Sequence, residues 1–170
     1  MFRYITMTKR NTKDFIDQEC YNSIAPSYNE LHGEEQLKKL ELIKPFLDSD
    51  LILDVGCGTG IASPEGSVGV DPSYELLKYN PNKFVVGHAE KLPFKNKSFD
   101  IITCMTAIHH FELDKALNEM KRVAKKKVII SVLRKAKNFD KIVERIKEEF
   151  KVSKILLEEK DVILICEAWV

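Results

Sequence analysis

The architecture of this chain of 170 residues follows from ten of them, Leu51-Ile52-Leu53-Asp54-Val55-Gly56-Cys57-Gly58-Thr59-Gly60. The first five are mostly apolar, which is typical of a short strand buried on both faces of a parallel sheet. The three glycines, spaced by two, allow a tight turn and a close approach of the backbone to a ligand. The stretch therefore predicts a first strand, residues 51–55, that ends at a ligand-binding turn.

Short apolar runs and amphipathic segments alternate along the rest of the chain. Buried strands are expected at residues 67–70, 84–86, 99–104 and 128–133, and helices at 33–45, 72–79, 112–124 and 138–150. Strands that alternate with helices imply right-handed crossovers and a parallel sheet. Only Glu158 to Asp161 separates two further strand-like runs, 153–157 and 162–168, so a hairpin makes the last pair antiparallel.

The pattern predicts one α/β domain with a Rossmann-like, mostly parallel seven-stranded sheet, an antiparallel last strand, helices on both faces and an N-terminal helical lid. We expect the lid over residues 1–49, a cofactor-binding core over 50–133, and a C-terminal helix and antiparallel hairpin over 134–170. With 44% hydrophobic and 31% charged residues, the composition is that of one globular domain.

The sequence argues against several other classes of protein. The four cysteines are far apart and form no CxxC pair or metal-ligand cluster, so we expect reduced thiols and no metal site. No apolar run approaches the ~18 residues that span a bilayer. The first 13 residues carry scattered charges and lack the apolar core of a signal peptide. A cytoplasmic protein without a membrane segment is predicted.

The glycine turn suits a ligand without phosphate groups. A dinucleotide site requires G-x-G-x-x-G at the start of a full helix, whereas Gly60 comes one position early and Pro64 with Gly66 limits the next helix to about one turn at most. S-adenosylmethionine carries a sulfonium, an amino-acid end and an adenosine, but no phosphate. Asp54 is expected to attract its amino and sulfonium end, and Asp71 to accept both ribose hydroxyls. Taken alone, the glycine triplet also fits a purely structural turn.

Four stretches, in order, resemble the class I S-adenosylmethionine-dependent methyltransferases, specifically the UbiE-like or methyltransferase type 11 group. They are LDVGCGTG (53–60), VGVDPS (68–73), GHAEKLPF (87–94) and SFDIITCMTAIHHF (98–111). A looser similarity joins YNSIAPSYN (21–29) to the Y-x-x-x-A-x-x-Y-[DN] segment that folds over the cofactor in that family. The resemblance implies methyl transfer from S-adenosylmethionine.

The resemblance also implies which residues line the cofactor. The three glycines would lie along its methionine half, Asp71 at the ribose, Ala89 and Glu90 at the adenine edge, and Cys104 beside the sulfonium through its backbone. His88 stands where the family commonly has Asp, so an acceptor for the adenine amino group is missing or is a neutral imidazole. The complete set expected at the cofactor is Tyr28, Asp54, Gly56, Cys57, Gly58, Gly60, Asp71, Pro72, His88, Ala89, Glu90 and Cys104.

Substrate-side candidates are Tyr21, His109, His110, Arg134 and Lys135. A histidine after the fourth strand would serve as general base for an oxygen nucleophile, or the pair packs and caps a short helix. Tyr21, like Tyr28, contacts cofactor or substrate, or it belongs to the apolar face of a helix. The buried thiols of Cys57 and Cys104 are expected to behave as small apolar groups. No residue is assigned a catalytic role.

Although the net charge of the whole chain is +1, residues 115–151 carry a net charge of +8 and residues 14–114 carry one of −9. Lys125 to Lys127 are expected at the edge of the sheet away from the cofactor, and Arg134, Lys135 and Lys137 at the ligand-binding edge. The second group would hold an anionic methyl acceptor, RNA first and an acidic small molecule second, or it is a solvated helix start.

Other functions stay open at this point. No insertion follows the fifth strand, and such an open site fits a macromolecule, or a partner subunit or second copy that completes it. Small-molecule methyl transfer and a non-catalytic S-adenosylmethionine-binding subunit are alternatives. An oxidoreductase is disfavoured by the displaced third glycine.

Overall fold

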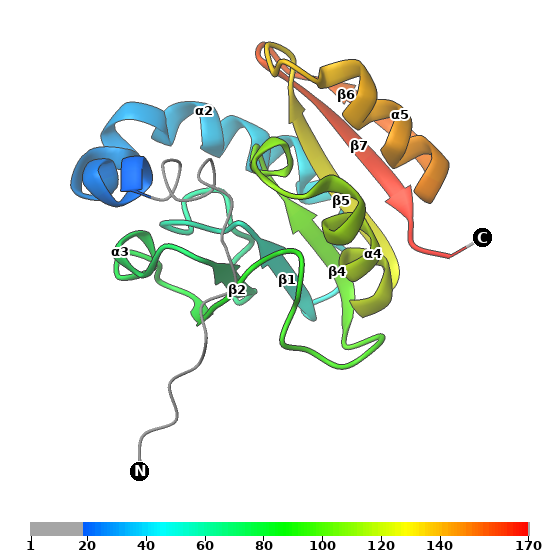
Figure 1. Cartoon of the computed structure of the whole chain (residues 1–170), viewed down its shortest axis with the longest axis horizontal. Coiled ribbons are helices and arrows are strands. Elements are labelled where there is room, and N and C mark those ends of the chain that lie inside the picture. The colour runs from blue at the N-terminus through cyan, green and yellow to red at the C-terminus, as the bar shows by residue number, and fades with distance from the viewer. Residues whose placement is uncertain (1–18, 170) are drawn as a thin grey trace.

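The computed structural model of the chain describes residues 19–169. One sheet holds seven strands in the order β3-β2-β1-β4-β5-β7-β6 (Figure 1). The strands are β1 (Ile52–Val55), β2 (Val68–Asp71), β3 (Lys83–Val86), β4 (Phe99–Cys104), β5 (Ala124–Leu133), β6 (Lys151–Leu157) and β7 (Asp161–Glu167). Neighbours pair in parallel except for β7, which runs antiparallel to β5 and β6. The predicted sheet with its antiparallel last strand is confirmed.

Helices cover both faces of this sheet, as predicted. They are α2 (Tyr28–Ile43), α3 (Tyr74–Leu77), α4 (Leu113–Val123) and α5 (Phe139–Glu149), with 3-10 turns η1 (Ala25–Ser27), η2 (Lys44–Phe46) and η3 (Ile108–His110). Residues 19–24 are also helical. Within residues 19–169, no helix combines the length and apolar character that crossing a bilayer requires.

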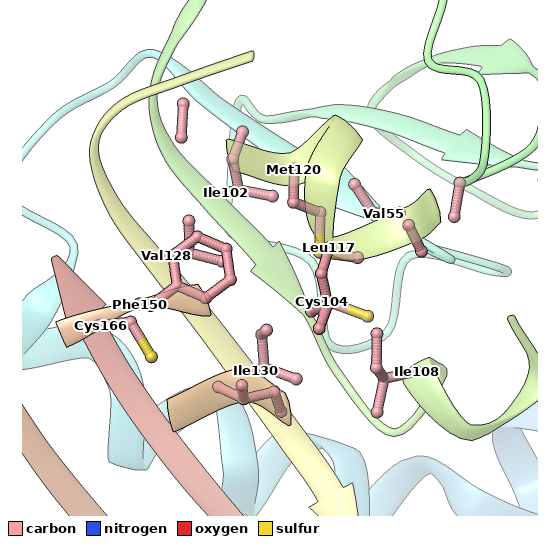
Figure 2. Close-up of a cluster of buried hydrophobic side chains, with 14 of the residues drawn as sticks. Val55, Ile102, Cys104, Ile108, Leu117, Met120, Val128, Ile130, Phe150 and Cys166 are labelled. Carbon is pink, nitrogen blue, oxygen red and sulfur yellow. The ribbon is translucent and has the colours of Figure 1, made fainter. Parts of the chain in front are cut away.

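Alternate residues of the central strands enter two separate cores. Ile102 and Ile130 face α4 and α5, where they pack with Leu117 and Met120 (Figure 2). Ile101 and Ile129 point to the opposite face and pack with Ile43 of α2. This alternation is the period-2 pattern of a strand covered on both sides.

The predicted apolar face of α2 is confirmed in part, since Ile43 is buried and Leu40 and Leu47 pack against the same core. The helix begins at Tyr28, not Gly33, and Leu37, expected on the apolar face, is 47% exposed. Gln36 and Lys39 are buried instead. The burial of Lys39 is possible because Asp161 of β7 supplies a buried counter-charge.

Two local predictions are wrong. All four residues of β3 are exposed rather than buried, because β3 is an edge strand and only β2 pairs with it. Strand β5 begins at Ala124 instead of Val128, so Lys125 to Lys127 lie within it. No helix forms after Gly60, in agreement with the interruption expected from Pro64 and Gly66, and residues 56–67 form turns and bends.

Candidate functional site

The glycine turn after β1 requires glycine for its conformation and for space. Gly56, Gly58 and Gly60 have φ values of 74°, 49° and 77°, in the left-handed region that favours glycine. A Cβ on Gly60 would lie 2.4 Å from Oδ1 of Asn80, and one on Gly56 would lie 2.6 Å from Cβ of Ala107. The turn is thus wedged between the loop after α3 and the segment after β4.

Asp71 ends β2 with its carboxylate held at the glycine turn. Its Oδ2 accepts a hydrogen bond from the Gly58 amide at 3.0 Å, and its Oδ1 accepts one from the Ser73 amide at 2.8 Å. Burial raises the pKa of Asp71, while the Ser73 and Gly58 amides and the nearby His88 oppose that rise. Each carboxylate oxygen keeps a second lone pair for a further donor.

Asp54, the last residue but one of β1, is also buried, with 2% of the residue exposed. Its Oδ1 accepts a hydrogen bond from the Thr103 hydroxyl at 2.8 Å, and its Oδ2 accepts one from the Ser63 hydroxyl. Burial raises the pKa of Asp54 to about 7 against the effect of these two hydroxyls. The side chain therefore joins the turn to β4, and its contact with a ligand's amino group stays a prediction.

The thiols beside the turn are buried. Burial raises the pKa of both Cys57 and Cys104, so both stay protonated at neutral pH. A Cβ on Gly69 would lie 2.5 Å from the sulfur of Cys57, which shows how tightly this thiol fills the space between β1 and β2. These thiols act as packing groups, in line with the interpretation from sequence.

Two asparagines that the sequence interpretation missed tie the N-terminal segment to the site. The Ser73 hydroxyl donates to Oδ1 of Asn22 at 2.6 Å, and the Thr59 hydroxyl donates to Oδ1 of Asn29 at 2.6 Å. Both asparagines stand in the YNSIAPSYN stretch, of which only Tyr21 and Tyr28 are expected at the site. The segment around them lies across the loops that follow β1 and β2.

Four of the predicted aromatic residues come together at this segment. Oη of Tyr21 lies 2.9 Å from Nε2 of His110, and the rings of His109 and His110 are 4.1 Å apart. The rings of Tyr21 and Tyr28 are 6.3 Å apart. Burial, followed by the charges of Asp71 and Glu35, raises the pKa of Tyr28. The pair of histidines thus faces the N-terminal segment that carries Tyr21.

The residues expected at the adenine edge follow β3. His88 is exposed and pairs with Lys91 in an isolated bridge, whereas Ala89 is buried. Oε1 of Glu90 accepts a hydrogen bond from the Glu112 amide at 2.9 Å, just before α4. Pro72 is half-buried beside Asp71. Among these, His88 is the one that acts electrostatically on Asp71.

The two basic clusters differ in their partners. Lys125 and Lys126 pair with Asp100 at 3.3 and 2.9 Å, and Lys127 pairs with Asp48 at 3.0 Å. The second cluster, Arg134, Lys135 and Lys137, is exposed just after β5. Among the ion pairs of residues 19–169, none involves these three side chains. They emerge at the same sheet edge as the glycine turn.

Comparison with known proteins agrees with this geometry. A family model described as a methyltransferase domain matches residues 53–132. The fold is shared with the crystal structure of magnesium protoporphyrin IX methyltransferase from Synechocystis PCC 6803 with bound SAM, at a TM-score of 0.74 and 15% identity. That alignment covers 95% of this chain and 99% of the other.

Curated relatives lie closer in sequence. The uncharacterized protein MJ1123 of Methanocaldococcus jannaschii is 30% identical over 79% of this chain and 71% of its own length. The uncharacterized protein MJ1252 of that organism is 41% identical over 64% of this chain and 47% of its own, so the match spans about half of it. A human probable tRNA methyltransferase 9B is 31% identical over 61% of this chain and 25% of that protein.

The chain belongs to the class I S-adenosylmethionine-dependent methyltransferases. The cofactor of this class is S-adenosylmethionine. The residues present fit it, because the turn offers no helix N-terminus for a phosphate and Asp71 keeps acceptor capacity for hydroxyl groups.

Proposed function

We propose that this protein transfers the methyl group of S-adenosylmethionine to RNA. The observation that carries the choice of acceptor is the exposed cluster Arg134, Lys135 and Lys137, which has no ion-pair partner among the described residues and lies at the ligand-binding edge. Unpaired cations beside a reaction site attract phosphates, since each contact releases condensed counterions. An RNA acceptor also agrees with the cytoplasmic location predicted above.

In this proposal the predicted residues contact different parts of the cofactor. Asp71 accepts the ribose hydroxyls with the lone pairs that its two amide donors leave free, and the glycine turn lies along the methionine half. Ala89 and Glu90 stand at the adenine edge. Tyr28 closes the site from the N-terminal segment, where its ring lies 6.3 Å from that of Tyr21.

The reaction requires alignment more than side-chain chemistry. S-adenosylmethionine supplies an electrophilic methyl group on a sulfonium, and the protein's task is to align the acceptor and exclude water. A neutral nitrogen acceptor needs no base during bond formation, whereas a hydroxyl acceptor does. His109 and His110 are the candidates for that base, and Nε2 of His110 is already engaged by Tyr21.

Similarity to the human probable tRNA methyltransferase 9B supports an RNA acceptor. The similarity spans only a quarter of that protein. It therefore supports the acceptor class and does not identify a particular tRNA or base.

The test compares two triple variants with the same change in charge. Replacement of Arg134, Lys135 and Lys137 by Gln should weaken binding of unfractionated tRNA about tenfold or more, and should lower the slope of log K against log salt by about 2. Replacement of Lys125, Lys126 and Lys127 by Gln should do much less, because each of those lysines already pairs with Asp100 or Asp48. Equal effects from both sets, or none from the first, would overturn the RNA proposal.

A cleft of about 420 Å³ favours a second candidate, a small-molecule acceptor. Its lining includes His109, Phe111, Asn138 and Lys141. Phe111 also lies against the glycine turn, since a Cβ on Gly56 would be 3.1 Å from its ring. Transfer of label from methyl-labelled cofactor into RNA, protein and small-molecule fractions of the source cell distinguishes the two, and label in the small-molecule fraction alone supports this candidate.

A further inference from the structure

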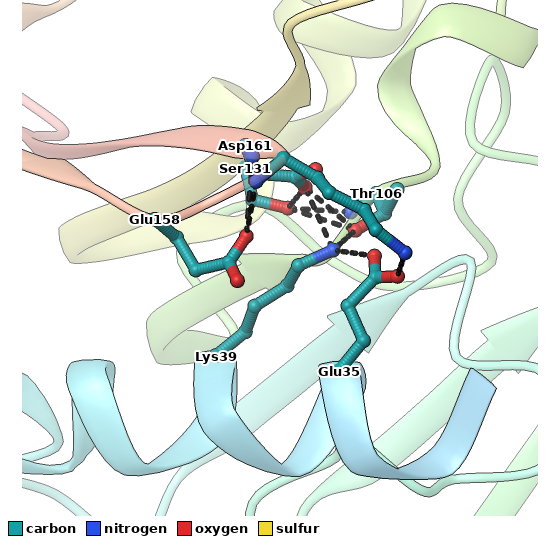
Figure 3. Close-up of polar contacts among 7 residues, drawn as sticks. Glu35, Lys39, Thr106, Ser131, Glu158 and Asp161 are labelled. Carbon is teal, nitrogen blue, oxygen red and sulfur yellow. Dashed lines mark hydrogen bonds and ion pairs between the residues drawn. The ribbon is translucent and has the colours of Figure 1, made fainter.

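A buried polar network joins α2 to the sheet (Figure 3). The Nζ atom of Lys39 lies 3.1 Å from Oδ2 of Asp161 and donates to the Thr106 hydroxyl at 2.8 Å and to Oε1 of Glu35 at 2.7 Å. The side chains of Lys39 and Asp161 are both 0% exposed. Each charge therefore needs the other, because an isolated buried charge is strongly unfavourable.

The same network holds Thr106 in an unusual backbone conformation. Its φ is 55°, in the left-handed region that β-branched residues rarely adopt. Its amide donates to Oγ of Ser131 at 2.6 Å, and its hydroxyl donates to Oδ2 of Asp161 at 2.8 Å. The Ser131 hydroxyl donates to the same carboxylate oxygen at 2.9 Å. Such a conformation persists only where the surroundings over-determine it.

Thr106 directs the segment that follows β4 toward the site. The next residue, Ala107, is the one whose Cβ limits the space beside Gly56. Three residues later, His110 meets Tyr21 of the N-terminal segment. The backbone angle at Thr106 thus determines how residues 107–110 lie against the glycine turn.

Helix α2 touches the site at two places. Near its start, Asn29 accepts a hydrogen bond from Thr59 of the glycine turn. Almost three turns further on, Lys39 reaches Thr106. One helix therefore spans the turn that follows β1 and the segment that follows β4.

We propose that Lys39 is a positioning residue for methyl transfer, because it holds Thr106 in the left-handed conformation and so sets residues 107–110 against the glycine turn. The inference rests on the proposed function. Lys39 acts through Thr106 and is not a catalytic residue. Asp161 of β7 and Ser131 of β5 also form hydrogen bonds with Thr106 and stabilise the same conformation.

The first test uses Lys39→Met, which keeps an unbranched side chain as far as its ε position and removes the ammonium. Its control is Lys38→Met, which breaks an exposed pair with Glu34 that has the same spacing on the helix. In protein labelled with ¹³C at threonine, we expect Lys39→Met to shift the Thr106 signals and Lys38→Met to leave them in place. With unfractionated tRNA as acceptor, kcat should fall about tenfold or more in Lys39→Met alone, with a smaller change in KM for tRNA.

Two double variants separate positioning from stability. Lys39→Met with Asp161→Asn removes both buried charges, so its stability should recover while kcat stays low. Lys39→Met with Thr106→Gly should regain at least threefold in kcat over Lys39→Met, because glycine adopts the left-handed conformation without help.

Several results would overturn the proposal. They are unchanged Thr106 signals in Lys39→Met, full kcat in the variant without either charge, or no rescue by Thr106→Gly. If Lys39→Met does not fold, the variant without either charge supplies both readouts. The Thr106 signals are recorded without cofactor or acceptor, so they test this inference independently of activity. The proposed function would instead be refuted if the wild-type protein neither bound S-adenosylhomocysteine nor methylated tRNA.

Discussion

Asp54 and Asp71 lie near the carboxyl ends of two neighbouring strands, and their hydrogen-bond partners give them different roles. Both are buried and both have a raised pKa. Asp54 accepts from the hydroxyls of Ser63 and Thr103, which connects the glycine turn to β4. Asp71 accepts from two backbone amides at the mouth of the turn. One aspartate joins the elements of the site, and the other keeps free acceptors, which we propose for the ribose of the cofactor.

The buried carboxylate of Asp54 predicts a dependence of stability on pH. Its pKa rises from 3.8 to about 7 on folding, so between these values the folded protein keeps a proton that the unfolded chain has released. The free energy of unfolding therefore falls as pH rises through this window and levels off above it. At 1.36 kcal/mol per pH unit, the loss is about 4 kcal/mol at most.

Asp54→Asn isolates this effect from other titrating groups. Asn cannot ionise and still offers an acceptor to Ser63 or Thr103. Urea unfolding of both proteins from pH 4 to pH 8 should show the variant gaining stability relative to wild type as pH rises to 7. A difference that is independent of pH would show that Asp54 is ionised at low pH in the folded protein.

At the scale of elements, the glycine turn depends on both conformation and crowding. Gly60 and Gly66 have almost the same φ, 77° and 76°. A Cβ at Gly60 would meet Asn80 at 2.4 Å, whereas one at Gly66 would meet nothing within 4 Å. A comparison of Gly60 with Gly66, six residues apart, therefore distinguishes the effect of backbone strain from that of steric conflict.

Gly66→Ala should cost only the strain of a left-handed alanine, about 1–2 kcal/mol of unfolding free energy. Gly60→Ala should cost more than that, because Asn80 has to move as well, and it should also weaken S-adenosylhomocysteine binding. Urea unfolding and calorimetric titration measure the two effects. Equal stability and equal affinity in the two variants would show that Asn80 moves away without cost.

At the scale of the whole molecule, the sheet brings distant segments to one edge. The carboxyl ends of β1, β2, β4 and β5 meet there, and the N-terminal segment lies across the first two. A ligand bound at this edge contacts loops from across the chain. Binding should therefore stabilise the whole fold rather than one loop.

Thermal unfolding in the presence of ligands tests this expectation. S-adenosylhomocysteine at a hundred times its Kd should add about 2.7 kcal/mol, which raises Tm by roughly 5–10 °C for a domain of this size. NADH should leave Tm unchanged. Asp71→Asn should lose at least about half of the shift at the same concentration, because the hydrogen bonds that we propose from the ribose hydroxyls to residue 71 would no longer be charge-assisted. A shift with NADH as large as that with S-adenosylhomocysteine would favour a dinucleotide site.

Much of the architecture could be predicted from local patterns. The alternation of apolar runs with amphipathic segments predicted the seven strands and the antiparallel end, since burial on both faces and a short hairpin leave clear marks in sequence. The spacing of Gly56, Gly58 and Gly60 predicted the turn, because few other residues adopt those angles. The order of the four motifs indicated the family.

Contacts between distant residues were decided by the tertiary structure alone. The burial of Lys39 on α2 depends on Asp161, more than a hundred positions away, so helical periodicity predicted Ile43 and Leu40 but could not predict Lys39. The exposure of β3 depends on its place at the edge of the sheet. A left-handed Thr106 depends on partners from α2, β5 and β7. Local sequence carries propensity and periodicity, but the counter-charge, the neighbour and the strand order exist only once the chain has folded.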